Sequence, residues 1–429
     1  MSRSSAAAVP AERSVRHEDG HETAESTTAD TLPPPAGERW LVEPAQTVRL
    51  FTTDEPLRLA RGGRIGPVDV RFETYGTLSP ERDNAIFICH ALTGDAHAAG
   101  YHPGDTKPGW WSTMIGPGRP IDTDRFFVVC PNILGGCQGT TGPASVDPAT
   151  GSTYGLSFPI LDMSDFVVVH RALCRHLELP QLRAVVGGSL GGMQVLEWML
   201  RHPDDMEAAV IIAASSRLTA QNIAFSAVAR EAIMRDSGFH HGHYLDDGVS
   251  PETGLAIARM MAHITYLSEE ALAAKFGRDP QHDDLDPGFG ADFAVESYLR
   301  HQGEVFLDRF DALSYLYLSR VMDYFDPFAR PGATEAVSRR APATLVCSFS
   351  SDWRFSPDHS RRIVRRLIAA GAPVTYREIP SDSGHDSFLL EVPRYLDTVR
   401  AFLDAPPAPR AGESSAPARN TPGSNGGRS

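Results

Sequence analysis

One short stretch limits the possible folds of this chain more than any other. The valine-rich run Ala184-Val185-Val186 leads into GGSLG at 187–191, and a helix-forming segment follows over 193–201. Glycines around a serine suit a tight, strained turn, because larger side chains would collide there. A strand, a glycine-framed serine and a helix are typical of a nucleophile elbow, which exposes the hydroxyl of Ser189 above a sheet. The alternative is an ordinary tight turn without chemistry.

Two later segments supply a candidate acid and a candidate base. Asp352 follows a predicted buried strand at 343–349, and His385 follows a predicted strand at 374–379. Ligands of parallel α/β sheets gather at the carboxyl ends of the strands, where both residues would lie. The chain has 16 His and 54 acidic residues, so either residue alone would mean little. The order Ser, Asp, His is that of the α/β-hydrolases, and it predicts that Asp352 orients His385, which takes the proton of Ser189.

A candidate oxyanion hole precedes the elbow in the chain. The apolar run at 85–89 predicts a buried strand that leads directly into HALTG at 90–94. This loop is placed like the oxyanion loop of lipases and esterases. We expect the backbone N–H groups of Leu92 and Leu190 to stabilise the oxyanion. The alternative is an ordinary loop between a strand and the next element.

The hydrophobic pattern divides the chain into three parts. Residues 45 to about 215 alternate predicted strands and helices, which favours a mostly parallel sheet. From about 220 to 330 the pattern is helical, and the strand–helix pattern resumes at 343. The predicted strands are 68–75, 85–90, 126–130, 184–187, 209–213, 343–349 and 374–379. The predicted helices are 162–179, 193–201, 222–235, 252–263, 268–275, 291–302, 310–322 and 392–403.

These patterns predict an α/β-hydrolase fold with a mostly parallel central sheet and an inserted helical lid. The core would comprise residues 39–219 and 336–404, and the lid 220–335. A lid over the Ser189 turn would exclude water and shape the pocket. The terminal segments 1–38 and 405–429 are rich in small and polar residues and are predicted to be disordered.

Composition excludes several classes of function. With 429 residues and 41% hydrophobic content, the chain can form one large domain with an insertion. The net charge of −14 argues against a nucleic-acid partner. No apolar run is long enough for a transmembrane helix or resembles a secretory signal, so we expect no membrane association. The 5 cysteines lack the spacing of metal ligands and favour a reducing cytoplasm. The cluster HHGH at 240–243 suggests either a metal site or an exposed polar loop; we favour the loop and expect no metal.

Several motifs together resemble those of a known family. They are HALTGD at 90–95, PGWW at 108–111, GPG at 116–118, NILGGC at 132–137, GGSLGGMQ at 187–194, SRLTAQNIAF at 216–225, GLAIARM at 254–260, HITYL at 263–267, FDALSYL at 310–316, MDYFD at 322–326 and GHD at 384–386. Over about residues 45–403 the chain resembles the homoserine O-acyltransferases of the α/β-hydrolase superfamily. The resemblance implies a ping-pong reaction in methionine biosynthesis, with an acyl-CoA and L-homoserine as small-molecule substrates. It also implies a homodimer formed through the lid helices. The CoA thioester is a substrate, so no cofactor is expected.

The resemblance also implies roles for individual residues. It gives the nucleophile, acid and base as Ser189, Asp352 and His385, and it places substrate contacts on Arg259 and Asp386. Homoserine is a zwitterion, so a guanidinium for its carboxylate and a carboxylate for its ammonium make chemical sense. Two structural alternatives stay open: Arg259 pairs with an acid of the lid, or Asp386 caps a helix that starts near residue 387.

The acyl donor depends on the segment that follows the acid. The chain is most similar to the succinyl-using branch of the family, in which an arginine here is tied to the choice of acyl-CoA. Succinyl carries a terminal carboxylate, and Arg354 lies two residues from Asp352. The alternative is a solvent-facing arginine. Leu313 departs from the family, which often has asparagine there. We therefore predict a homoserine O-succinyltransferase. The competing hypotheses are an acetyltransferase, a serine O-acyltransferase, an esterase and a non-catalytic binding protein.

Overall fold

The computed structural model describes residues 39–281 and 288–405, and its centre is an eight-stranded sheet. The strands lie in the order β1-β4-β8-β5-β9-β10-β11-β12. Neighbours pair in parallel from β8 to β12, whereas β4 is antiparallel to β1 and to β8. The strands are β1 Gln46–Phe51, β4 Val68–Tyr75, β5 Ala85–Cys89, β8 Phe127–Pro131, β9 Leu182–Gly188, β10 Met206–Ile212, β11 Ala343–Phe349 and β12 Val374–Ile379.

All seven predicted strands lie in this sheet, within a few residues of their predicted bounds. Strand β1 escaped the prediction because it is an edge strand whose side chains are all exposed or only partly buried. Its hydrophobic signal is therefore weak.

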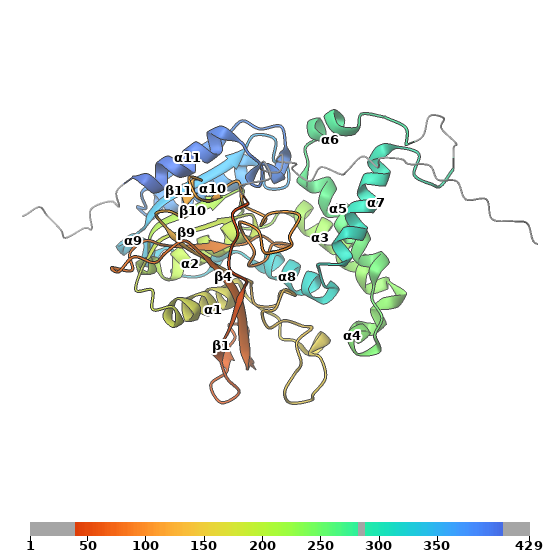
Figure 1. Ribbon diagram of the computed structural model, residues 1–429, viewed down its shortest axis with the longest axis horizontal. Helices are drawn as coiled ribbons and strands as arrows, with labels where there is room; N and C mark the ends of the chain where they lie inside the picture. Colours follow the sequence, from red (N-terminus) through yellow and green to blue (C-terminus); the bar gives the residue numbers. More distant parts are fainter. Residues whose placement is uncertain (1–38, 282–287, 406–429) are drawn as a thin grey trace, which may run out of the picture.

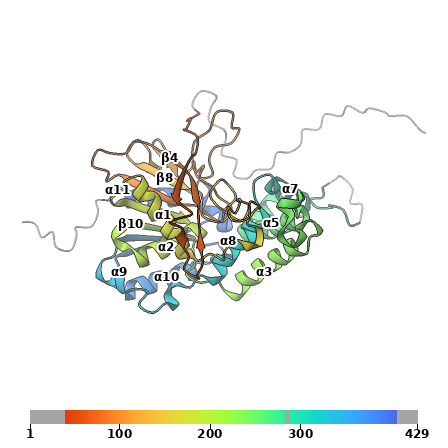
Figure 2. The ribbon, with the colours of Figure 1, turned by 90° about the horizontal axis from the view of Figure 1, so that it is seen from below.

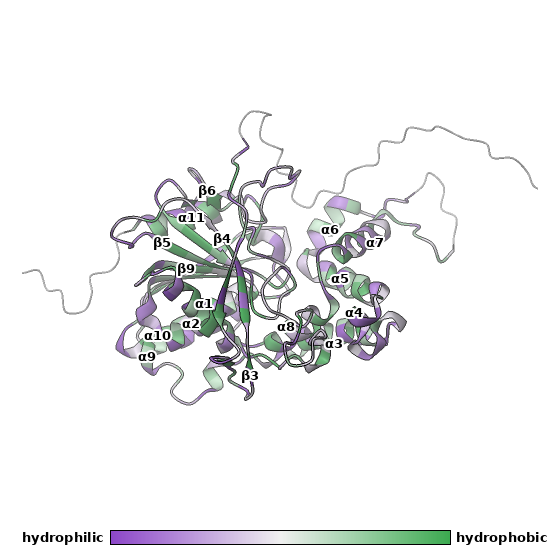
Figure 3. Cartoon of the chain, turned by 60° about the horizontal axis from the view of Figure 1, so that its bottom comes forward, coloured by the Kyte–Doolittle hydropathy of each residue, from purple (hydrophilic) through white to green (hydrophobic). Residues whose placement is uncertain are grey.

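Strand β5 is buried on both faces. Ala85, Phe87 and Cys89 contact one hydrophobic cluster, and Ile86 and Ile88 contact the other. Successive side chains of a strand point to opposite faces, so a strand covered on both sides becomes a continuous apolar run. Figure 3 shows the inner strands β5 and β9 in the hydrophobic colour. This burial holds the carboxyl ends of the strands, and the loops that leave them, on a rigid base.

Helices cover both faces of the sheet (Figure 1). The first cluster receives side chains of α1 (Met163–His176), α2 (Leu190–Arg201) and α10 (Pro357–Ala369), and the second those of α11 (Pro393–Asp404). Helix α1 begins with a capping box in which Asp162 accepts the N–H of Ser164 and the carboxylate of Asp165 accepts the N–H of Asp162. Helix α10 was not among the predicted elements.

A block of helices separates β10 from β11. It comprises α3 (Ala220–Arg235), α4 (Tyr244–Asp247), α5 (Glu252–Tyr266), α6 (Glu269–Phe276), α7 (Ala294–Leu307), α8 (Ala312–Tyr324) and α9 (Glu335–Arg339). The part of this block that the structure describes contains no strand. Figures 1 and 2 both show α3, α5 and α7 packed together beside the sheet, with α8 between them and the strands. The division into core and lid stays a prediction.

The predicted alternation of strands and helices is wrong for the connection from β5 to β8. Residues 90–126 form no α-helix and contain the two-residue strands β6 (Ile115–Gly116) and β7 (Ile121–Asp122). Their many glycines and prolines interrupt helices. The strands β6 and β7 pair in parallel, whereas β2 (Leu57–Arg58) and β3 (Arg64–Ile65) form a small antiparallel hairpin. The tails 1–38 and 406–429, predicted to be disordered, lie outside the described residues.

Candidate active site

The predicted elbow forms the turn between β9 and α2. Ser189 has φ 58° and ψ −121°, a strained conformation for a residue with a side chain. Position 191 has no room for a side chain, because a Cβ there would lie 1.9 Å from the carbonyl oxygen of Cys89. That carbonyl precedes the 90–94 loop, so the missing side chain lets this loop approach the first turn of α2. The helix places its positive end at the serine.

The three predicted triad residues come together at the carboxyl ends of the strands. The Oγ of Ser189 lies 2.9 Å from Nε2 of His385, and Nδ1 of His385 lies 2.7 Å from Oδ2 of Asp352. The other carboxylate oxygen of Asp352 accepts the N–H of Phe355 at 2.8 Å. All three triad residues are buried. With Nδ1–H donated to the carboxylate, Nε2 is the free base that can accept the serine proton.

The two predicted oxyanion donors lie on adjoining segments. Leu190 is the first residue of α2, where the N–H groups have no partner within the helix. Leu92 is buried in the loop after β5. A Cβ on Gly191 would also lie 3.2 Å from the carbonyl oxygen of His90, which shows how closely the loop and the helix start approach each other. The arrangement fits the predicted oxyanion hole.

His90 and Gln194 hold the oxyanion loop, and sequence analysis missed both. Nε2 of His90 accepts the N–H of Ile133 at 3.0 Å, so the ring proton is on Nδ1, which donates to the carbonyl of Ala91 at 2.7 Å. Burial lowers the pKa of His90, which keeps the ring neutral. The amide of Gln194 donates to the carbonyl of His90 at 3.1 Å. The sequence signal that could have indicated their role was position. His90 directly follows β5, and Gln194 lies in the second turn of α2.

Arg259 on α5 faces the site from the helical block. Its guanidinium carbon lies 4.8 Å from the ring centroid of Phe306 and 5.9 Å from that of Tyr266. Its Nε is shielded from solvent and has no hydrogen-bond partner. Burial lowers the pKa of Arg259, and the nearby Tyr266 and Asp386 oppose this shift. Within residues 39–281 and 288–405, no acid forms an ion pair with Arg259, so the described part of the lid offers no such partner.

Arg354 is buried, with 8% of its surface exposed, so the solvent-facing alternative is wrong. Its Nη1 donates to Oγ1 of Thr265 at 2.6 Å, and its guanidinium carbon lies 5.3 Å from the ring centroid of Tyr266. Among the described residues, no carboxylate lies within ion-pair distance of this guanidinium. Tyr266 therefore contacts both arginines, and its ring centroid lies 6.0 Å from that of His385.

Asp386 follows His385 in the chain and lies near enough to Arg259 and Arg354 to be influenced by both charges. Burial raises its pKa to about 6, although His385, Arg259 and Arg354 pull the pKa downward. The short helix here spans Gly384–Phe388 and begins before Asp386, whose side chain does not cap it. The helix-cap alternative is therefore wrong. The helical block is fitted closely to this segment, because a Cβ on Gly384 would lie 2.6 Å from the carbonyl oxygen of Tyr266.

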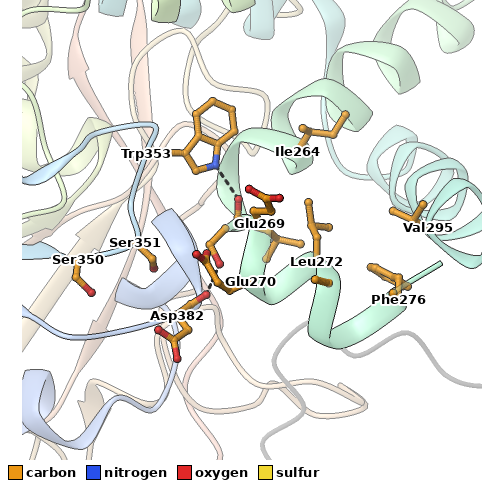
Figure 4. Close-up of a pocket in the computed structure, with 14 residues that line it drawn as sticks. Ile264, Glu269, Glu270, Leu272, Phe276, Val295, Ser350, Ser351, Trp353 and Asp382 are labelled. Atoms are coloured by element: carbon orange, nitrogen blue, oxygen red, sulfur yellow. Dashed lines mark hydrogen bonds between the residues drawn. The ribbon is translucent and has the colours of Figure 1, made fainter. Parts of the chain in front are cut away.

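A pocket of about 890 Å³ lies beside this site, between α6 and the loop after β11 (Figure 4). Trp353 forms part of its wall and donates its indole N–H to the carbonyl of Leu267 at 2.8 Å. None of the eight predicted site residues lines this pocket. Its carboxylates, Glu269, Glu270 and Asp382, would repel the phosphates of CoA. We assign the pocket to neither substrate.

The comparisons with known proteins agree with this geometry. A family model described as alpha/beta hydrolase fold matches residues 84–392. The homoserine O-succinyltransferase of Nocardioides sp. (strain ATCC BAA-499 / JS614) is 56% identical over 358 residues, which cover 83% of this chain and 97% of that protein. The chain belongs to the homoserine O-acyltransferase family. The predicted family and α/β-hydrolase fold are thereby confirmed.

Family members that are named for a different acyl donor are also similar to this chain. The homoserine O-acetyltransferase of Caulobacter vibrioides (strain NA1000 / CB15N) is 51% identical over 377 residues, covering 87% of this chain and 96% of that protein. The crystal structure of a homoserine O-acetyltransferase from Bacillus anthracis superposes with a TM-score of 0.79 at 26% identity, covering 86% and 99% of the two chains. Family membership therefore does not by itself choose the acyl donor.

Three further expectations concern the chain outside the site. No helix within the described residues has both the length and the apolar composition needed to cross a bilayer. His240, the first residue of the HHGH cluster, lies with its Nδ1 2.8 Å from the carboxylate of Asp247. Leu313, where the family often has asparagine, is fully buried in α8 and contributes to the core.

Proposed function

We propose that this protein transfers a succinyl group from succinyl-CoA to the hydroxyl of L-homoserine in methionine biosynthesis. The observation that carries the proposal is the charge pattern around Tyr266. Arg259 and Arg354 lie beside its ring, and no carboxylate in residues 39–281 and 288–405 is at ion-pair distance from them, while Asp386 lies near enough to influence both charges. A shielded charge without a partner is costly, so two such cations favour ligands that bring carboxylates.

The two substrates together carry the matching charges. The α-carboxylate of homoserine suits Arg259, its ammonium suits Asp386, and the terminal carboxylate of a succinyl group suits Arg354. Arginine binds carboxylates through two parallel N–H donors, which fixes orientation as well as affinity. An acetyl group has no charge for Arg354 to bind.

The triad geometry supports a two-step mechanism. Ser189 Oγ attacks the thioester carbonyl while His385 Nε2 takes its proton, and the N–H groups of Leu92 and Leu190 stabilise the oxyanion. The C–S bond then breaks, and the imidazolium returns the proton to the leaving CoA thiolate. In the second half, His385 takes the proton of the homoserine hydroxyl, which attacks the acyl-serine. Collapse of that intermediate releases O-succinyl-L-homoserine and returns the proton to Ser189. The transfer requires no cofactor.

Acetyl transfer is the second candidate, favoured by the 51% identity to the acetyltransferase of Caulobacter vibrioides. The deciding experiment measures kcat/KM for succinyl-CoA and acetyl-CoA, each with homoserine and with serine. We expect the succinyl-CoA and homoserine pair to be preferred. Preference for acetyl-CoA would establish the second candidate. Loss of acyl groups to water without an acceptor preference would establish an esterase.

The two acceptors, homoserine and serine, differ less from each other than the two acyl donors do. The two amino acids differ by one methylene, which a pocket discriminates by only about 1–3 kcal/mol. In the absence of acceptor, succinyl-CoA should add one succinyl mass to the peptide that contains Ser189. That adduct tests the ping-pong mechanism independently of the acceptor.

We propose a homodimer formed through the helical block. Apolar side chains on α3, α5 and α7 are exposed, namely Val228, Ile257, Ile264 and Val305. Contiguous exposed apolar surface commonly marks a protein interface. Val228→Glu and Ile257→Glu should convert a dimer to a monomer in light scattering. The matched control is Ile368→Glu on α10, which is equally exposed but outside this block. A wild-type monomer would contradict the proposal.

The proposed location is the cytoplasm. The five cysteines are all free, and four of them are buried. Free thiols persist in a reducing compartment. Fractionation of cells that express the protein tests this proposal, and recovery in an extracytoplasmic fraction would contradict it.

A further inference from the structure

A second polar cluster lies on the segment that follows the oxyanion loop. Glu73 on β4 is buried, with 2% of its side chain exposed, and it contacts the rings of His97 and His102. The two rings are stacked with their centroids 4.0 Å apart. Asp105 lies on the other side of both rings. None of these four residues belongs to the proposed acyl-transfer machinery.

We propose that Glu73, His97 and His102 bind a divalent transition-metal ion of the zinc type. Each residue offers one donor atom, and the three donor atoms all lie within 4.8 Å of one another. Imidazole and carboxylate donors together suit such ions. Three protein ligands leave a fourth tetrahedral position for water.

The distances within the cluster match those around a metal. Nδ1 of His97 lies 3.0 Å from Oε2 of Glu73, and Nε2 of His102 lies 3.2 Å from Oε1. Ligand atoms of a tetrahedral zinc ion, each about 2.0–2.2 Å from the metal, are about 3.3 Å apart. The Nε2 atom of His102 is buried and has no hydrogen-bond partner despite the nearby carboxylate oxygen. A metal ion bound by Nε2 of His102 and the carboxylate of Glu73 would give this nitrogen a partner.

Asp105 supplies the outer carboxylate that metal-binding histidines usually have. Its Oδ2 lies 3.6 Å from Nε2 of His97 and 3.4 Å from Nδ1 of His102, which are the ring nitrogens that face away from Glu73. The same oxygen accepts the backbone N–H of His102 at 2.8 Å, so the carboxylate is held in place. A carboxylate on the second nitrogen fixes the orientation and tautomer of a metal-binding ring.

The local charges favour a cation. The carboxylates of Glu73 and Asp105 lie against the His97 ring, and Asp95 lies near enough to add its negative charge. The same carboxylates would stabilise a metal ion. The hydroxyl of Tyr75 donates to Oε2 of Glu73 at 2.8 Å and accepts the N–H of Ala98 at 2.7 Å. A bound ion would therefore fasten residues 96–102 to β4, next to the oxyanion loop.

The test is metal binding by the full-length chain without a purification tag. The chain is stripped with a chelator, titrated with ZnCl₂ by calorimetry, desalted and analysed for retained zinc. We expect one tightly bound zinc per chain and a rise in melting temperature. His97→Ala, His102→Ala and Glu73→Gln should each weaken binding by about 100-fold or more, since loss of an outer partner alone costs about 10- to 100-fold. His240→Ala is the matched control, because His240 also contacts a carboxylate but lies outside the cluster.

Two measurements keep the test valid if a ligand variant misfolds. Asp105→Asn changes a carboxylate that is partly exposed and should weaken zinc binding by about 10- to 100-fold. Wild-type protein loaded with Co²⁺ should show the visible bands of nitrogen and oxygen coordination. The proposal is overturned if the wild type retains no stoichiometric zinc, or if the cluster variants bind zinc as the wild type does. If the wild type retains no zinc, hydrogen bonds hold the cluster together without a metal ion. Neither result depends on the acyl-transfer proposal.

Discussion

The strand side and the helical side of the active site differ in how their polar groups are satisfied. On the strand side, Ser189, His385 and Asp352 hydrogen-bond to one another, and Asp352 also accepts a backbone N–H. On the helical side, Arg259 of α5 and the side chain of Arg354, which reaches Thr265 of α5 from the loop after β11, have no carboxylate at ion-pair distance among the described residues. An arginine of the helical block, Arg230, shows the usual arrangement. Its guanidinium lies 2.7 Å from the carboxylate of Asp323, and both side chains are buried.

This difference separates chemistry from recognition. The triad is assembled before any substrate arrives, so its geometry costs nothing at the moment of reaction. Among the described residues, no carboxylate forms an ion pair with the arginines near Tyr266, so a substrate carboxylate can neutralise their charge. The helical side is therefore the part that should determine which substrates react.

The largest expected effect is on the strand side. Ser189→Ala should lower kcat by about 10⁶-fold, because no other group can carry the acyl chain. Melting temperature should change little, which separates lost chemistry from lost folding. Activity close to that of the wild type would show that the elbow is a structural turn.

The acid of the triad should matter less than the nucleophile. Asp352→Asn should lower kcat by about 10⁴-fold, since the amide stabilises the wrong tautomer of the imidazole. Adding Ser189→Ala to this variant should cost little beyond Ser189→Ala alone, because the three residues act as a unit. Steady-state kinetics of the two single variants and the double variant test this. Multiplicative losses would show that Asp352 acts independently of Ser189.

Stability should distinguish a paired arginine from an unpaired one. Asp323→Asn leaves Arg230 buried without its partner and should cost about 3–5 kcal/mol in the free energy of unfolding. Arg354→Met removes a buried cation that has no carboxylate partner among the described residues, and it should be neutral or stabilising. Urea denaturation measures both values. Equal destabilisation by the two substitutions would remove the proposed distinction between the arginines.

Each unpaired arginine should govern a different substrate. A charge-assisted hydrogen bond contributes about 1.5–3 kcal/mol, so Arg354→Leu should lower kcat/KM for succinyl-CoA by roughly 10- to 150-fold. Its kcat/KM for acetyl-CoA should stay level or rise, since that donor has no carboxylate. Arg259→Leu should instead lower kcat/KM for homoserine with either donor. If Arg354→Leu impairs both donors equally, Arg354 is structural.

The smallest expected effect is a descending limb at low pH in the kcat/KM profile of one substrate only. Asp386, with its pKa raised to about 6, is ionised above that pH and can bind the homoserine ammonium. As pH falls through 6 the carboxyl is protonated, so kcat/KM for homoserine should fall about tenfold per pH unit. The profile for acyl-CoA should lack this limb, because Asp386 is proposed to bind only the homoserine ammonium. Asp386→Asn should remove the limb along with most homoserine affinity. A limb shared by both substrates would assign the pKa elsewhere.

The sequence alone was enough to predict the elements that depend on the pattern of residues close together in the chain. The elbow around Ser189 depends on glycine positions and on the strand and helix beside it, so it could be predicted in detail. Asp352 and His385 could be placed because each follows directly after a strand. The missed edge strand β1 and the glycine-rich segment 90–126 lack that periodic signal.

Only the tertiary structure decided which distant residues meet. The order of strands and the packing of the helical block bring Ile133 to His90, and Asp323 to Arg230. The same packing places no carboxylate of the described chain at ion-pair distance from Arg354, and it brings Glu73 to the stacked histidines. Nothing in local periodicity encodes such contacts, because they depend on how elements far apart in the chain are arranged. The sequence therefore identified the catalytic order and the candidate substrate-binding charges, whereas the surroundings of those charges and the proposed metal site could be seen only in the folded packing.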